Sequence, residues 1–397
     1  MRNGGPVPSP DNRYAGQKDI PMIYLDNAAT TRLTEPVLSA MLPFLTSEYA
    51  NPAAGYGFAR QARQAVEKAR EQCAALLSAL PEEIVFTGSG SEADNWALRS
   101  ALILTGKRHI VTTRIEHHAV LRCCEFLKTM GAEITVLDVD ADGFVSPEAV
   151  REALTENTAL VSVMTANNEI GTIQPIREIG GICRSRGVLF HTDAVQAFGH
   201  IPLNPEEAGV DLLSASAHKL HGPKGAGLLY VRRGLSLPPL LYGGSQENGR
   251  RAGTSNTAGI VGFGAAAEAA MKGMKTEAER IAAMRDTFVG RVLTEIPGVR
   301  LNGHLTRRLP GIVSLTFSSL SGSELMMLMD RAGICVSTGA ACSAASREPS
   351  HVLTAIGLSR AEANGTIRLS LSGETTQEEM DTAVGVLKEA AAALRSL

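Results

Sequence analysis

The chain has 397 residues, 44% of them hydrophobic, which is enough to bury one large core and a smaller second one, so two domains are expected. Its 41 acidic and 38 basic residues leave a formal net charge of −3, spread along the sequence, and exclude a broad basic surface for nucleic acid or an anionic membrane. No stretch of eighteen apolar residues and no signal-peptide pattern is present, so we expect a cytoplasmic protein that acts on a small molecule.

Six cysteines are too few for a disulfide framework in a chain of this length, and none forms a CxxC pair, so no metal site is expected. Free thiols are therefore predicted, one or two of them reactive. If Cys342 is the reactive cysteine, the remaining five cysteines are expected to be buried structural thiols. The six are Cys73, Cys123, Cys124, Cys183, Cys335 and Cys342.

Residues 1–21 combine prolines and glycines with no apolar periodicity, which indicates a flexible extension outside the fold. From residue 22 to 262, short β-branched runs alternate with helical patterns, which favours an α/β domain with a mostly parallel seven-stranded sheet and helices on both faces. The predicted strands are 83–87, 109–113, 133–139, 159–164, 188–193, 211–216 and 227–231.

Residues 263–397 predict a smaller α+β domain. A long helix rich in alanine and charged residues is expected over 265–294, and a second helix over about 324–332. Strands are expected over 311–317 and 367–371, with a final amphipathic helix from Thr376.

Polar residues follow several of the predicted strands, at the edge where open α/β sheets bind ligands. Residues 87–92 (TGSGSE) lie between a strand and a helix, so their backbone N–H groups and the Ser91 hydroxyl could bind a phosphate at the helix start. A tight turn without a ligand is the alternative interpretation.

Asp193 ends the predicted strand 188–193, and Lys219 follows the next predicted strand, 211–216; the two residues are twenty-six positions apart. A lysine that forms a Schiff base with pyridoxal phosphate (PLP) lies at a strand end, and a carboxylate on a neighbouring strand keeps the pyridine nitrogen of PLP protonated. The two residues fit these roles. A surface lysine and a helix-capping aspartate are the alternative.

Further segments extend this pattern over the chain from about residue 22 to its C-terminus. The segments are 24–31 (YLDNAATT), 51–52 (NP), 90–95 (GSEADN), 116–120 (EHHAV), 167–171 (NNEIG), 193–196 (DAVQ), 216–219 (SAHK), 222–225 (GPKG), 251–254 (RAGT) and 339–346 (GAACSAAS).

In this order, the segments resemble those of cysteine desulfurases of the NifS/IscS type, which are class V aminotransferase-fold PLP enzymes of fold type I. The resemblance implies that the chain converts L-cysteine to L-alanine and passes the sulfur to Cys342 as a persulfide. A protein acceptor would then take the sulfur into iron–sulfur cluster assembly or another pathway. Residues 53–60 depart from the serine, histidine and glycine pattern that is usual there in the family.

The resemblance also implies a role for each site residue. Lys219 would form the Schiff base with PLP, Asp193 would pair with the ring nitrogen, and His117 would stack on the ring and could assist proton transfer. Arg368 would hold the substrate carboxylate through its two-donor fork. The remaining PLP contacts would come from Gly90, Ser91, Asn168, Gln196, Ser216, His218 and, from the second subunit of a homodimer, Thr254.

Cys342 lies in a run of small polar residues typical of a loop, which suits a thiol that must visit the active site and then an acceptor. Three alternatives stay open: a selenocysteine lyase, an aminotransferase for a small amino acid, and a catalytically silent partner protein. Cys342 argues against the aminotransferase. The silent partner would be free to lose Lys219, Asp193 or Cys342, and the sequence keeps all three.

Overall fold

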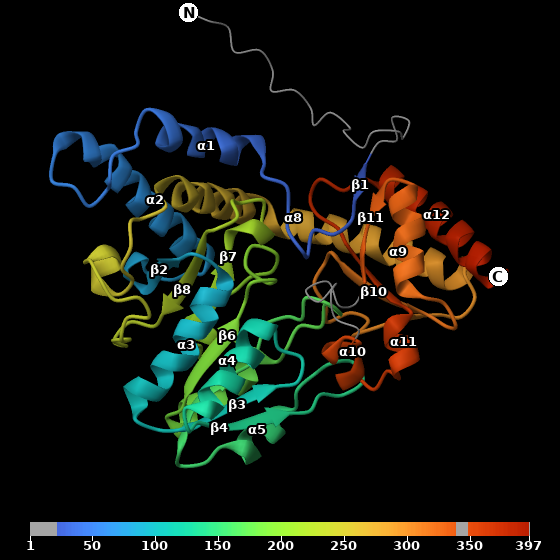
Figure 1. Ribbon diagram of the computed structural model, residues 1–397, viewed down its shortest axis with the longest axis horizontal. Coiled ribbons are helices and arrows are strands. Elements are labelled where there is room, and N and C mark those ends of the chain that lie inside the picture. Colours follow the sequence, from blue (N-terminus) through green and yellow to red (C-terminus); the bar gives the residue numbers. More distant parts are fainter. Residues whose placement is uncertain (1–21, 339–347, 397) are drawn as a thin grey trace, which may run out of the picture.

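The computed structural model describes residues 22–338 and 348–396, so the extension at residues 1–21 and the thiol of Cys342 lie outside the described residues. Its centre is a seven-stranded sheet in the order β2-β8-β7-β6-β5-β3-β4 (Figure 1). Only β8 runs against its neighbours, so the predicted mostly parallel sheet is confirmed. Its strands are β2 (Ile84–Thr87), β3 (His109–Thr113), β4 (Glu133–Leu137), β5 (Thr158–Ser162), β6 (Leu189–Asp193), β7 (Leu212–Ser216) and β8 (Gly227–Val231).

Both faces of this sheet are covered by helices, because successive residues of a buried strand point to opposite sides. Val85 packs in the cluster beneath α3 (Gly90–Thr105) and α4 (His118–Thr129), whereas Phe86 packs in the cluster on the other face. That second face is covered by α2 (Arg60–Leu76), α5 (Pro147–Ala153), α6 (Ile176–Arg186) and the first part of α8 (Thr257–Glu295), with the short α7 (Pro205–Ala208) beside α6.

Helix α8 begins eight residues earlier than the sequence pattern predicts, at Thr257 instead of 265. The glycines in its first turns suggest a loop, but they serve close packing against α2 and against α1 (Glu35–Thr46). A Cβ on Gly264 would lie 2.5 Å from Ala69 Cα, and one on Gly262 would lie 2.6 Å from Met41 Sδ. Helix α8 then continues to the smaller sheet (Figure 1). The expected domain boundary at 262–263 falls within this helix and stays a prediction.

The smaller sheet has the order β12-β13-β10-β9 and is antiparallel. Strands β10 and β13 form a separate hydrophobic cluster with helices α9 and α12 and the end of α8. A two-stranded parallel ladder of β1 and β11 joins the first described residues to this part of the chain. The elements are β1 (Ile23–Tyr24), β9 (Val299–Leu301), β10 (Ile312–Phe317), α9 (Gly322–Arg331), β11 (Ile334–Cys335), β12 (Ser337–Thr338), α10 (His351–Ala355), α11 (Arg360–Asn364), β13 (Thr366–Ser370) and α12 (Gln377–Arg395).

Four of the predicted structural thiols are buried on helices, as expected: Cys73, Cys123, Cys124 and Cys183. The prediction of a buried thiol is wrong for Cys335, because this residue lies in a two-residue strand, β11, and is only partly buried. Among the described residues, no helix combines the length and the unbroken apolar sequence needed to cross a bilayer.

Candidate functional site

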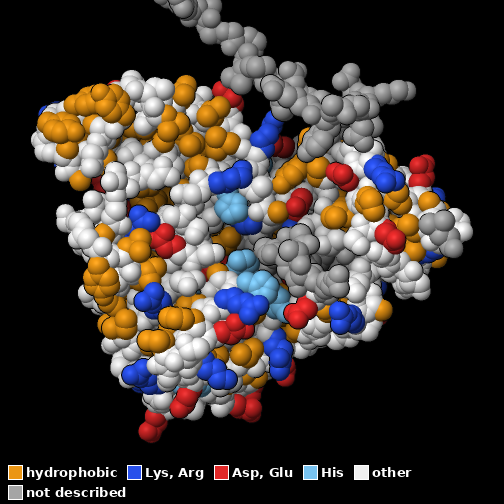
Figure 2. All heavy atoms as spheres, viewed as in Figure 1, with side chains coloured by type: hydrophobic (Ala, Val, Ile, Leu, Met, Phe, Trp, Pro, Cys, Tyr) orange, Lys and Arg blue, Asp and Glu red, His pale blue; other side chains and the backbone are white. Residues whose placement is uncertain are grey.

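A cavity of about 270 Å³ opens at the carboxyl ends of the large-sheet strands, close to the size of small-molecule sites. Histidine side chains gather in the middle of the same face of the molecule (Figure 2). The structure brings ten of the predicted site residues to this cavity: Gly90, Ser91, His117, Asn168, Asp193, Gln196, Ser216, His218, Lys219 and Arg368. Thr254 is not among the lining residues and is exposed, and Cys342 lies outside the described residues.

One wall of the cavity is the first turn of α3. The helix begins after Ser89, whose side chain accepts a hydrogen bond from the backbone N–H of Glu92 at 3.1 Å. Gly90 is required by space, since a Cβ there would lie 2.5 Å from Val195 Cγ2. The backbone therefore comes close to the cavity with its N–H groups at the positive end of the helix dipole, which favours an anion.

His218 also lines the cavity and pairs through Nδ1 with the Thr30 hydroxyl at 3.2 Å. Burial and the neighbouring Lys219 ammonium lower the pKa of His218 to about 4. The imidazole is therefore neutral near pH 7 and can bind an anion by one N–H.

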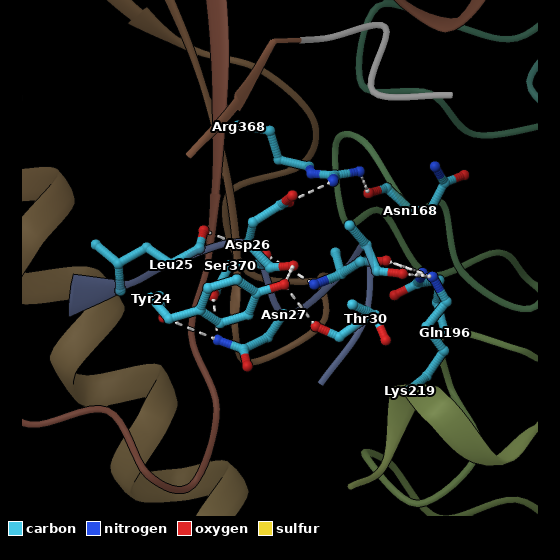
Figure 3. Close-up of polar contacts among 12 residues, drawn as sticks. Tyr24, Leu25, Asp26, Asn27, Thr30, Asn168, Gln196, Lys219, Arg368 and Ser370 are labelled. Atoms are coloured by element: carbon cyan, nitrogen blue, oxygen red, sulfur yellow. Dashed lines mark hydrogen bonds and ion pairs between the residues drawn. The ribbon is translucent and has the colours of Figure 1, made fainter. Parts of the chain in front are cut away.

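Lys219 is the last residue of the 3₁₀ turn that follows β7. Its Nζ donates to the carbonyls of Ala28 at 2.6 Å and Ala29 at 2.7 Å. Gln196 Nε2 donates to the same Ala28 carbonyl at 2.9 Å, so both side chains converge on the segment that follows β1 (Figure 3). These contacts hold the lysine amine at the cavity wall.

Asp193 ends β6 and is 5% exposed. Burial raises its pKa, while His117, the Val195 N–H that donates to Oδ1 at 2.9 Å and Lys219 favour the ionised form and lower it. Burial lowers the pKa of His117, against the raising effect of Asp193. His117 Nδ1 accepts from the N–H of Ala119 at 3.1 Å and so also caps α4, and the His117 side chain lines the cavity.

Arg368 lies in β13 and is 2% exposed, although it carries a charge. Its Nη2 donates to Asp26 Oδ1 at 2.7 Å and its Nη1 to the Asn168 carbonyl at 3.0 Å (Figure 3). The Nε atom is buried and has no partner among the described residues. An unpaired buried donor at the cavity is suited to a carboxylate ligand. Sequence reasoning missed Asp26, which lies within the YLDNAATT segment.

The chain on either side of Cys342 is attached close to Arg368. On the N-terminal side, Ser337 of β12 pairs with Arg368 itself in the small sheet. On the C-terminal side, the Ser350 hydroxyl donates to the buried carboxylate of Glu169 at 2.5 Å. Burial raises the pKa of Glu169 to about 7, although the Ser350 hydrogen bond lowers it.

Asp94 is a cavity residue that sequence reasoning missed. It lies one turn after Gly90 on the buried face of α3, with Ala97 and Ala101, and is 1% exposed. Burial raises its pKa well above the ordinary value, and the neighbouring Asp193 raises it further. An acid within an otherwise apolar helical stripe was the signal that could have revealed it.

The side chains present fit PLP in their chemistry. A lysine amine, an acid for a ring nitrogen and a helix start for a phosphate all face one cavity, and Gly90 leaves the backbone room to approach an anion. Asp94, His117 and Asp193 also place potential metal-ligand atoms within 4.8 Å of one another, but the amine and the anion-binding helix start match PLP better.

Comparison with known proteins agrees with this chemistry. Residues 23–382 match the family model for aminotransferase class-V. A protein of Dictyoglomus turgidum named cysteine desulfurase IscS is 48% identical over 378 residues, which cover 94% of this chain and 96% of that protein.

Solved structures also resemble this chain over most of its length. A structure titled NIFS-like protein superposes with a TM-score of 0.88 at 39% identity and covers 95% of this chain and 100% of its own. A structure titled SspA in complex with cysteine has a TM-score of 0.78 at 38% identity, with 89% and 100% covered.

Proposed function

This chain belongs to the aminotransferase class-V family, and we propose that it works there as a PLP-dependent cysteine desulfurase that converts L-cysteine to L-alanine. Its relatives of that name are 45–48% identical over more than nine-tenths of the chain, and a similar solved structure contains cysteine. The single observation that carries the proposal is the meeting of Lys219, Asp193 and Arg368, from three distant segments, around one cavity.

PLP, when bound, supplies an aldehyde for amines and a ring that withdraws electrons from the bonds at the substrate Cα. In our proposal the Lys219 amine binds the cofactor and, once released, moves a proton at the substrate Cα. The Asp193 carboxylate keeps the ring nitrogen protonated, and His117 covers the ring face. Gly90, Ser91, Ser216 and His218 hold the phosphate, while Gln196 and Asn168 lie at the ring edge.

Arg368 orients the substrate in this scheme. Its guanidinium lines the cavity and would meet the substrate carboxylate there, while Asp26 and the Asn168 carbonyl keep the guanidinium plane fixed. A fixed carboxylate determines which bond at Cα stands perpendicular to the ring and therefore which bond breaks.

Cys342 receives the sulfur. Its thiolate attacks the substrate sulfur, an S–S bond forms and the substrate C–S bond breaks. The electron pair of that bond stays on carbon, which takes up a proton to become the methyl group of alanine, and Cys342 keeps the sulfur as a persulfide. The attachment of β12 beside Arg368 and of Ser350 to Glu169 supports this role, since both flanks of the Cys342 segment start near the substrate position.

We also propose a homodimer in which Thr254 reaches the phosphate site of the second subunit. Thr254 is exposed and lies outside its own cavity, which supports a role across an interface. Large apolar side chains are exposed on α1 and the segment after it, and Figure 2 draws a hydrophobic area over α1. These side chains are Leu42, Leu45, Tyr49, Tyr56 and Phe58.

The persulfide would pass to a protein acceptor for iron–sulfur cluster assembly or another sulfur-requiring pathway. A cytoplasmic location is part of this proposal, supported by five unbridged cysteines among the described residues. The acceptor itself is defined by chemistry alone, as a protein thiol that can accept sulfur from a persulfide.

The test is product analysis with the purified protein, PLP and L-cysteine. A desulfurase produces one alanine for each sulfur released and needs no 2-oxo acid. An aminotransferase would instead require a 2-oxo acid, and a selenocysteine lyase would release alanine from L-selenocysteine alone. A silent partner protein would show no protein-bound aldimine band after PLP is added and the unbound cofactor is removed. Any of these three results would overturn the proposal.

A further inference from the structure

Two buried carboxyl groups face each other at the Asp193 end of the cavity. Asp94, on α3, is 1% exposed, and Asp193, at the end of β6, is 5% exposed. Their oxygen atoms and a ring nitrogen of His117 all lie within 4.8 Å of one another. Two carboxylates buried this close to each other do not both ionise near neutral pH, because the charged pair repels and neither charge is hydrated.

The surroundings assign the negative charge to Asp193. Its Oδ1 accepts the Val195 N–H, and both His117 and Lys219 favour the ionised carboxylate. Hydrogen bonds and nearby positive charge are the two influences that stabilise a carboxylate in a buried site.

Neither a hydrogen bond nor a cation stabilises a negative charge on Asp94 Oδ1, since this atom accepts no hydrogen bond from the described residues. The nearest basic group is His191 Nε2, 3.6 Å away. That imidazole is bonded to the hydroxyls of Ser162 at 2.9 Å and Ser214 at 3.0 Å. Burial lowers the pKa of His191 to about 3, so it is neutral and offers Asp94 no cation.

A third acid also lies near Asp94. Glu116, from the segment between β3 and α4, raises the pKa of Asp94 in addition to burial and Asp193. A hydrogen bond from Ser214 acts in the opposite direction but does not outweigh them. Apart from the His117 ring, which lies within 4.8 Å of both carboxyl groups, Asp94 therefore has only acids and neutral groups around it.

We propose that Asp94 carries a proton in the working enzyme, so that the single negative charge of this carboxyl pair rests on Asp193, next to the ring nitrogen of PLP. The inference rests on the proposed function, in which Asp193 meets that nitrogen. Asp94 is a positioning residue, because its protonated carboxyl group directs its O–H toward Asp193 and stabilises the Asp193 anion. A negative charge on Asp94 would instead compete with Asp193 for the proton of the ring nitrogen.

Two substitutions separate this role from packing. Asp94→Asn keeps a neutral donor of the same shape, so the PLP dissociation constant and the pH dependence of the visible absorbance should stay within about threefold of the wild type. Asp94→Ala removes the donor and should weaken PLP binding roughly tenfold. Both variants are first compared in melting temperature. Equal losses in the two variants would overturn the proposal.

Infrared spectroscopy of the holoenzyme observes the proton directly. The wild type at neutral pH should show a carbonyl band of a buried protonated carboxyl group that is missing in Asp94→Asn. Glu116→Gln is the matched control, because Glu116 is also a buried acid and its substitution should leave the Asp94 band in place. Absence of the band from the wild-type minus Asp94→Asn difference would overturn the inference.

Asp193→Asn distinguishes this inference from the proposed function. If Asp193→Asn binds PLP with unchanged affinity and spectrum, Asp193 does not serve the ring nitrogen and the proposed function fails there. The infrared difference at Asp94 is read independently of that result.

Discussion

Arg368 Nη2 donates a hydrogen bond of 2.7 Å to Asp26 Oδ1, and these residues lie 342 positions apart in the chain. The same guanidinium donates to the Asn168 carbonyl of the large-sheet side, so three distant segments fix one side chain (Figure 3). The small sheet therefore delivers a substrate-binding group to the cavity of the large sheet in a single orientation.

Arg368→Lys should lower kcat/KM for L-cysteine roughly 100-fold, because a lysine offers one point charge in place of a planar fork. The PLP absorbance should be unchanged, since Arg368 has no role toward the cofactor in our proposal. Asp26→Asn is the companion variant. It should raise KM about tenfold by loosening the arginine, and a normal KM would contradict the role of Asp26.

Lys219→Ala should lose the covalent link to the cofactor and nearly all turnover, because the amine both binds PLP and moves the Cα proton. Borohydride reduction followed by peptide mass mapping should place PLP on Lys219 in the wild type and on no residue in the variant. Continued alanine production by Lys219→Ala would refute the assignment.

Gly90→Ala should weaken PLP binding, because the new Cβ would lie 2.5 Å from Val195 Cγ2 and push the helix start away from the phosphate. We expect a loss of about tenfold or more in affinity in a PLP titration. Gly181→Ala, in α6, is the control, since no atom lies within 4 Å of its added Cβ. That variant should bind PLP normally.

The pH dependence of the free energy of unfolding should reveal the raised pKa of Glu116. Burial raises its pKa from 4.5 to about 8, although hydrogen bonds from Thr113 and the Met164 N–H lower it. Between these two values the folded protein keeps a proton that the unfolded chain releases, so stability falls as pH rises, by at most roughly 1.4 kcal/mol per pH unit.

Glu116→Gln removes this proton linkage while keeping a neutral side chain of the same shape. Denaturant unfolding from pH 5 to 8 should therefore show a smaller loss of stability in the variant than in the wild type. Glu389→Gln, at an exposed position of α12, should follow the wild type. Parallel curves for wild type and Glu116→Gln would contradict the raised pKa.

Much of the fold could be predicted from local sequence patterns. The seven strands of the large sheet are buried runs bounded by helical segments, and polar residues at their carboxyl ends meet because parallel strands end at one edge. That geometry is why Asp193 and Lys219 could be assigned to one cavity from the strand pattern, whereas His117 and Ser216 were assigned to it through the family resemblance.

Features that depend on contacts between distant segments could not be predicted in this way. The start of α8 was missed because Gly262 and Gly264 are explained only by the helices that pack against them. The pairing of Arg368 with Asp26 and the burial of Asp94 beside Asp193 likewise depend on tertiary neighbours that no local pattern reveals.

The most direct test of the account is mass spectrometry of the peptide that contains Cys342 after the holoenzyme has turned over L-cysteine. We predict that this peptide gains the mass of one sulfur atom, that reduction removes the gain, and that alanine appears in equal amount. An unmodified Cys342 in an enzyme that accumulates alanine and sulfide would contradict the account.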